Sequence, residues 1–191
     1  MANRLAALTV CAAACAVSAL AQQKGGPPPP PMKLTSPAFT DSSAIPVENT
    51  CSGQPAGVSP ELQWTDAPKA AATFALILHD MEPLREKQSR EDIVHWIVWN
   101  IPGSAHQLPK AIDPATPQLA DGTRQGKNVR GAIGFTGPCA PPPINHHYVF
   151  ELYALDQSLT LEAGAMRADL LKAMDGHIVG HAVLVGLFHK E

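Results

Sequence analysis

Four segments of the chain are apolar on both faces, which is the pattern of strands buried in the interior of a protein. They are rich in β-branched and aromatic residues, and the turns between them contain Gly and Pro. We therefore predict four central strands, at Thr73–His79, Val94–Ile101, Tyr148–Leu155 and Ala182–Phe188.

One further segment, Ala165–Met174, has helical periodicity. Its apolar residues recur at the spacing of one helix face, and Gly176 stands where a C-terminal cap is expected. We predict a helix whose apolar stripe packs on the core, with the members Met166, Leu170, Leu171 and Met174. The dense charged segment Arg85–Asp92 is expected to form a solvated loop or a single helical turn.

Composition supports a mainly β fold made of many short elements. The 191 residues are 45% hydrophobic and 16% charged, with 19 prolines and 14 glycines spread along the chain. This length and apolar content suit one domain, which we place at residues 33–191. The net charge of −3 gives no reason to expect a nucleic-acid partner.

The N-terminus has the features of an export signal. Arg4 supplies a positive start, an apolar run follows, and Ala19-Leu20-Ala21 fits the small-residue cleavage rule. We predict a signal peptide at residues 1–21, a Pro-rich linker at 22–32, a periplasmic or secreted location, and no transmembrane segment after cleavage. A retained membrane anchor is the alternative. Removing Arg4 would leave 13 basic and 17 acidic residues, a net charge of −4.

Cysteine usage agrees with export but leaves the pairing open. Cys11 and Cys15 would leave with the signal peptide, whereas Cys51 and Cys139 would remain in an oxidising compartment. These two either form a disulfide or stay as free buried cysteines. Their spacing matches no zinc motif.

The segment Gly134–Tyr148, with the sequence GFTGPCAPPPINHHY, has the composition of an anion pocket. Glycine lets backbone N–H groups approach a ligand closely, and the prolines stiffen the loop. Alternation along an extended segment directs His146 and Tyr148 to one face, and His147 to the opposite one. We expect His146 and Tyr148 to face the pocket, and His147 to meet solvent or an acidic neighbour.

Two residues from other predicted strands are candidates for the same pocket. Asp80 follows the strand Thr73–His79 directly, so its carboxylate emerges at a sheet end. His95 lies near the start of the next predicted strand, and alternation places it on one face with Ile97 and Trp99. Asp80 would orient a histidine, hold its protonated form, or meet the ammonium of a zwitterionic head group, because a bare carboxylate repels an anion.

Seven ordered motifs give the chain a specific resemblance to a known family. It resembles a bacterial member of the phosphatidylethanolamine-binding protein family, also called Raf kinase inhibitor protein-like, from about Lys33 to the C-terminus. The motifs are NTCSG at 49–53, SPELQW at 59–64, FALILHDMEP at 74–83, HWIVWNIP at 95–102, GTRQGKN at 122–128, GFTGPCAPPP at 134–143 and HHYVFELYALD at 146–156.

The resemblance implies a β-sandwich of two antiparallel sheets with a few peripheral helices. It also implies a small pocket that accepts phosphate, acetate or phospholipid head groups. Where the family usually has Asp-Pro-Asp-Ala-Pro, this chain has Asp80-Met81-Glu82-Pro83, one residue shorter. The ligand-binding residues implied by position are Asp80, Glu82, His95, Gly137, Pro138, His146 and Tyr148.

The leading functional hypothesis is an exported protein that binds a small anion or a phospholipid head group, without a cofactor. By analogy with the family, it would also act on a protein partner as a kinase or protease inhibitor does. Protonation of His95 or His146 would strengthen anion binding, so affinity is expected to fall as pH rises past about 6.5.

Two alternatives remain open on the same residues. In the first, a hydrolase or lyase-type enzyme uses His95 or His146 as a general base oriented by Asp80, although the chain has no Gly-x-Ser-x-Gly motif. In the second, Asp80, Glu82, His95 and His146 hold a divalent metal.

Overall fold

The computed structural model describes residues 30–55, 57–87 and 89–191. The expected signal peptide at 1–21 and most of the expected linker lie outside these residues. Of the linker, residues 30–32 are described, and the side chain of Met32 is buried in the core. Among the described residues, no helix combines the length and apolar character that crossing a membrane requires.

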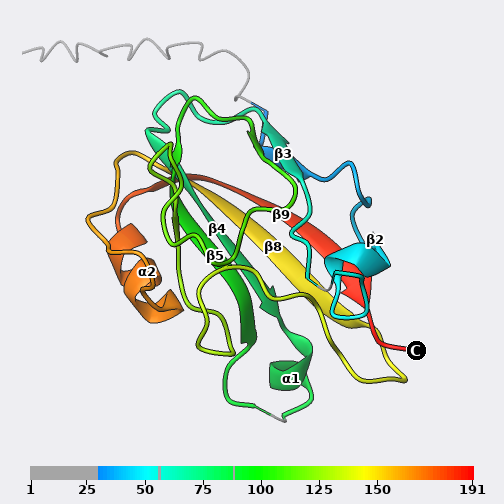
Figure 1. Ribbon diagram of the computed structural model, residues 1–191. Coiled ribbons are helices and arrows are strands. Elements are labelled where there is room, and N and C mark those ends of the chain that lie inside the picture. The colour runs from blue at the N-terminus through cyan, green and yellow to red at the C-terminus, as the bar shows by residue number, and fades with distance from the viewer. Residues whose placement is uncertain (1–29, 56, 88) are drawn as a thin grey trace, which may run out of the picture.

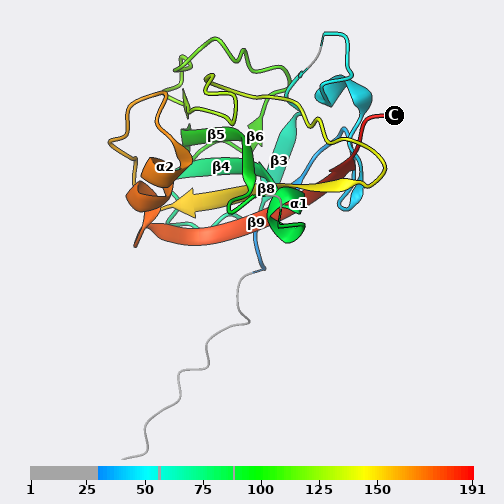
Figure 2. The same ribbon diagram turned by 90° about the horizontal axis from the view of Figure 1, so that it is seen from below.

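The main sheet has six strands, and its centre consists of the four strands predicted from the apolar pattern (Figure 1). All of its pairings are antiparallel except for the short pairing of β2 with β9, which is parallel. In spatial order the strands are β2 (Ser43–Ala44), β9 (Ile178–Phe188), β8 (His146–Leu155), β4 (Thr73–Asp80), β5 (Ile93–Pro102) and β7 (Arg124–Gln125). Figure 2 shows the four long strands side by side in the order β5, β4, β8 and β9.

A second, antiparallel sheet has the order β1 (Lys33–Thr35), β3 (Leu62–Thr65) and β6 (Gln107–Leu108). The helical elements among the described residues are the short 3-10 helix η1 (Val47–Asn49), the single-turn helix α1 (Glu82–Arg85) and α2 (Arg167–Met174). The mainly β fold with two sheets and few helices is therefore confirmed, with the parallel β2–β9 pairing as a local exception.

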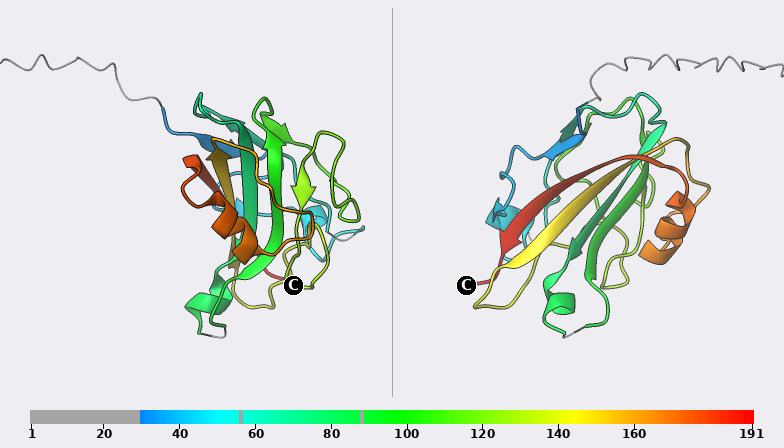
Figure 3. Two further views of the ribbon diagram at one scale, coloured as in Figure 1. Left: turned by 90° about the vertical axis from the view of Figure 1, so that its left-hand side faces the viewer. Right: turned by 180° about the vertical axis from the view of Figure 1, so that it is seen from behind.

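Strand β4 is buried along its whole length because apolar layers cover both of its faces. On the inner face, Phe74, Leu76 and Leu78 belong to the core shared with Trp64 of the three-stranded sheet. Ala75 and Ile77, on the outer face, lie in a second core with residues of α2. Figure 3 shows α2 against the main sheet.

The predicted helix is present, but only half of its apolar stripe is buried. Leu170 and Met174, four residues apart on one helix face, are buried against the sheet. Met166 and Leu171 are exposed, which corrects the prediction. Met166 has an extended backbone because it precedes the helix, and Leu171 is rotated by about 100° from Leu170.

A β-bulge in β5 places His95 on a different face from the one that simple alternation predicts. Leu78 pairs with Trp96 and His79 pairs with Val94, so His95 is the extra residue. His95 and Trp96 therefore both face inward, whereas Ile97 packs on the outer core. Bulges re-aim side chains in this way and are frequent next to functional sites.

The two cysteines left open by the sequence form a disulfide. The Cα atoms of Cys51 and Cys139 are 5.4 Å apart, and the bridge joins the segment after η1 to the loop before β8. Beside it, the Cys51 N–H donates to the Pro138 carbonyl at 3.0 Å. A Cβ atom on Gly137 would lie 2.7 Å from the backbone of Thr50, so glycine is required for this close approach.

Candidate anion-binding site

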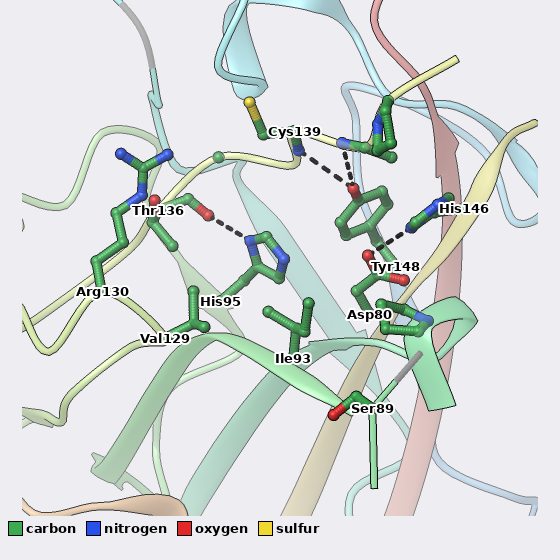
Figure 4. Close-up of a pocket in the computed structure, with 14 residues that line it drawn as sticks. Asp80, Ser89, Ile93, His95, Val129, Arg130, Thr136, Cys139, His146 and Tyr148 are labelled. Carbon is green, nitrogen blue, oxygen red and sulfur yellow. Dashed lines mark hydrogen bonds and ion pairs between the residues drawn. The ribbon is translucent and has the colours of Figure 1, made fainter. Parts of the chain in front are cut away.

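A cavity of about 390 Å³ lies where β4, β5 and β8 meet the loop before β8 (Figure 4). Five of the seven predicted ligand residues line it. The lining consists of Asp80, Pro83, Ser89, Ile93, His95, Val129, Arg130, Thr136, Gly137, Cys139, Ala140, Pro141, His146 and Tyr148.

The remaining two predicted residues, Glu82 and Pro138, are outside this lining. The chain turns into α1 directly after β4, and this turn directs the Glu82 carboxylate to the backbone N–H of His147 at 2.8 Å and to Arg85 at 2.6 Å. The carbonyl of Pro138 is occupied by Cys51. His147 has the acidic neighbour that we expected, because its Nδ1 lies 3.1 Å from both Glu82 carboxylate oxygens.

Asp80 holds His146 in a fixed orientation at one end of the cavity. The His146 Nδ1–H donates to Asp80 Oδ2 at 2.7 Å, and both side chains are buried. The other carboxylate oxygen, Oδ1, accepts the N–H of Glu82 at 3.0 Å. Because Nδ1 is committed to Asp80, Nε2 is the ring nitrogen of His146 that is left for a ligand.

His95 is held by two reciprocal bonds to Thr136. The His95 Nδ1–H donates to the Thr136 carbonyl at 3.0 Å, and the Thr136 N–H donates to the His95 carbonyl at 3.0 Å. Burial lowers the pKa of His95, and the nearby Arg130 guanidinium lowers it further. The imidazole is therefore neutral at pH 7, and its Nε2 is an acceptor until it gains a proton. For His95, the pH range over which protonation is expected to strengthen anion binding therefore lies below 6.5.

Tyr148 accepts two backbone N–H groups of the loop that was expected to offer such donors to the ligand. Its hydroxyl oxygen accepts the N–H groups of Cys139 at 3.1 Å and of Ala140 at 3.0 Å. Burial raises the pKa of Tyr148, as does the Asp80 carboxylate, so the phenol keeps its proton. Among the described residues, no acceptor receives that proton. The ring also makes an edge contact with His95 at a centroid distance of 5.1 Å.

Sequence reasoning missed Arg130, Thr136 and Ser89, which also line the cavity. Arg130 lies in a turn built by the buried Asn128, whose Oδ1 accepts the Arg130 N–H at 2.9 Å and whose Nδ2 donates to the Gly134 carbonyl at 2.9 Å. The sequence Asn128-Val-Arg-Gly131 is a turn signal that could have drawn attention to this loop. Nothing in it indicates which strand the loop packs against.

Comparison with known proteins identifies the family. The family model for phosphatidylethanolamine-binding protein matches residues 35–189. The chain belongs to the phosphatidylethanolamine-binding protein family. A UPF0098 protein of Methanothermobacter thermautotrophicus is 40% identical over 159 residues, covering 83% of this chain and 99% of that protein. A UPF0098 protein of Chlamydia trachomatis is 39% identical over 166 residues, covering 84% and 100%.

Solved structures agree with the family assignment. A Chlamydia trachomatis protein described as a putative phosphatidylethanolamine-binding protein homologue matches with a TM-score of 0.73 and 37% identity, covering 84% of this chain and 99% of that one. E. coli YbcL, described as a new member of the mammalian family, matches with a TM-score of 0.75 and 23% identity over 84% and 99%. The YbcL likeness shows the fold alone.

In this member of the phosphatidylethanolamine-binding protein family, the carboxylates of the alternative metal set are already bonded to other groups. Within the described residues, no three His, Cys, Asp or Glu side chains are placed to hold a metal ion. The Asp80 oxygens accept bonds from His146 and Glu82, and the Glu82 oxygens accept bonds from His147 and Arg85. The alternative metal set Asp80, Glu82, His95 and His146 is therefore not assembled.

Proposed function

We propose that this protein is an exported binding protein whose cavity recognises a phosphate or carboxylate group, either free or as part of a phospholipid head group. The observation that carries the proposal is the convergence of Tyr148, His95 and His146 on one small cavity, each with a group left for a ligand. The Tyr148 O–H is a neutral donor at all working pH values, and each histidine Nε2 becomes a donor on protonation.

In this proposal, Asp80 is a positioning residue for His146. Its bond to Nδ1 favours the orientation in which Nε2 faces the ligand, and it stabilises the imidazolium that an anion requires. The Asp80–His146 pair then carries no net charge when His146 is protonated, so its repulsion of an anion is small. Charge-assisted hydrogen bonds to such an anion are roughly twice as strong as neutral ones.

Export is supported by the N-terminal signal pattern and by the disulfide, because disulfides persist in oxidising compartments. A protein partner of the kinase- or protease-inhibitor type rests on family analogy. Expression with the native N-terminus, followed by mass measurement of the released protein, tests export. A mature chain that begins at Gln22 supports it, and a full-length chain retained in the cytoplasm contradicts it.

The binding proposal is tested by calorimetric titration with inorganic phosphate at pH 6. We expect wild-type protein to bind, and His146→Ala to lower the affinity about tenfold or more, because a hydrogen bond to the anion is lost. His189→Ala is the matched control, since His189 is outside the cavity lining. Equal affinities of wild type and His146→Ala would contradict the proposal.

The Asp80–His146 bond favours a second candidate function, in which His146 acts as a general base. The described cavity contains the hydroxyls of Ser89 and Thr136, but neither is bonded to a histidine ring nitrogen. Turnover of p-nitrophenyl phosphate or p-nitrophenyl acetate, abolished in folded His146→Ala, would establish this function. Rates equal to those in buffer would reject it for these substrates.

A further inference from the structure

A second cavity, of about 360 Å³, adjoins the first. It is lined by Cys51, Gly57, Pro114, Arg130, Phe135, Thr136 and Gly137. Arg130, Thr136 and Gly137 line both cavities, so we call these three residues the junction. Neither the family assignment nor the predicted site gives Arg130 or Thr136 a role.

Each residue of the junction carries a hydrogen-bond donor that the protein does not use. Within the described part of the chain, the Arg130 guanidinium, the Thr136 hydroxyl and the Gly137 N–H have no hydrogen-bond acceptor. This contrasts with the loop N–H groups of Cys139 and Ala140, which both donate to Tyr148. Three unused donors at one place are the arrangement that an anion satisfies.

The backbone of the junction is fixed on every side. Thr136 exchanges two hydrogen bonds with His95, and Gly137 lies against Thr50 beside the disulfide. The Arg130 N–H is held by Asn128. Thr136 and Gly137 lie on this fixed backbone, so their donors lose little entropy when a ligand binds, whereas the Arg130 guanidinium is carried by an exposed side chain and supplies charge.

The junction and the histidine end of the first cavity differ in the charge of the residues that line them. In the view of Figure 4, Arg130 and Thr136 lie on one side of His95, and Asp80 and His146 lie on the other. Among the described residues that line the second cavity, Arg130 is the one that carries a charge. An anionic group at the junction thus meets a permanent cation and lies away from the Asp80 carboxylate.

We propose that the junction is a second anion subsite, and that the ligand is a small molecule with two separated anionic groups. One group is held at His146 and Tyr148, as in the proposed function, on which this inference rests. The other group is held by Arg130, Thr136 and Gly137. A phosphate monoester that also carries a carboxylate has this chemistry, and Arg130 selects it over a phosphate monoester without the second charge.

The test compares two probes that differ mainly in the second anionic group. Glycerol 3-phosphate and 3-phosphoglycerate have the same carbon number, but the second carries a carboxylate where the first has a hydroxymethyl group. We expect wild-type protein to bind 3-phosphoglycerate about tenfold more tightly in calorimetric titrations, because a charged hydrogen bond is gained. In Arg130→Gln, the two affinities should become equal within about twofold.

Two further variants make the comparison specific. Thr136→Val keeps the shape and the backbone bonds of Thr136, and should reduce the preference to about threefold. Lys172→Gln removes one positive charge from the exposed face of α2, outside both cavities, and should keep the full preference. Circular dichroism checks that each variant is folded.

The outcomes separate this inference from the proposed function. Equal binding of both probes by wild-type protein, or a preference that survives in Arg130→Gln, overturns the second subsite while the histidine site stands. A loss of preference in Lys172→Gln also overturns it, because net charge alone would then explain the effect. If neither probe binds, both the second subsite and the proposed function fail.

Discussion

His95 and His146 both present Nε2 to the cavity, but their neighbours give them different properties. The Nδ1–H of His146 donates to the Asp80 carboxylate, and the Nδ1–H of His95 donates to the Thr136 backbone carbonyl. The group that accepts the Nδ1–H is therefore an anion for His146 and a neutral carbonyl for His95. One cavity therefore combines a histidine supported by a negative charge with a buried histidine whose pKa is lowered.

The lowered pKa of His95 predicts the direction of a pH effect on anion binding. A protonated His95 donates to the ligand, so sulfate affinity should rise as pH falls from 8 to 5, by at most about tenfold per pH unit for one proton. Sulfate keeps its charge across this range. His95→Gln should flatten the part of the rise below pH 6.5. An unchanged profile in His95→Gln would show that another group titrates.

Tyr148 is expected to stabilise the fold as well as the site. Tyr148→Phe removes the acceptor of two backbone N–H groups, of Cys139 and Ala140, and should lower the free energy of unfolding by about 1–3 kcal/mol. Urea denaturation measures this. Tyr148→Phe should also weaken phosphate binding, because the phenol proton that would be donated to the ligand is lost. Tyr153→Phe, outside the cavity, is the control and should leave phosphate affinity unchanged.

At the scale of single elements, the bulge in β5 brings His95 to the candidate site. A regular strand would place His95 on the outer face beside Ile97, away from Tyr148. The extra residue between the pairs Leu78–Trp96 and His79–Val94 returns His95 to the inner face. The alternation of apolar residues predicted the strand correctly, but two-residue periodicity carries no information about the position of a bulge.

Only one face of helix α2 packs against the outer face of the main sheet. Leu170→Ala should lower the free energy of unfolding by about 2–5 kcal/mol, because it opens a cavity in the outer core. Leu171→Ala, at the adjacent exposed position, should change it by less than about 0.5 kcal/mol. Chemical denaturation of the two variants measures the difference between their unfolding free energies. Equal losses of unfolding free energy would place both leucines in the core.

At the scale of the whole molecule, the disulfide connects the two cavities to the rest of the fold. Cys139 lines the first cavity and Cys51 lines the second, and the bridge spans 88 positions of sequence. A link of this length restricts the unfolded chain strongly. It also holds the loop that carries Gly137 against the segment after η1, so stability and site geometry depend on the same bond.

Removing the bridge should therefore affect both properties. The double variant Cys51→Ala, Cys139→Ala is expected to lose about 2–5 kcal/mol of unfolding free energy and to bind phosphate more weakly. Denaturation and titration with and without reductant measure this. Reductant should lower the stability of wild type but leave the double variant unaffected. Full retention of stability in the double variant would contradict a structural role for the bond.

The sequence by itself determined the four central strands, the fold class and five of the residues that meet in the first cavity. These features follow from local periodicity and from ordered motifs, which are properties of neighbouring residues. Pairing of the cysteines, the position of Glu82 outside the cavity and the contribution of Arg130 depend on which segments pack together. The tertiary structure alone decided these, because contacts between distant segments leave no periodic signal in the chain.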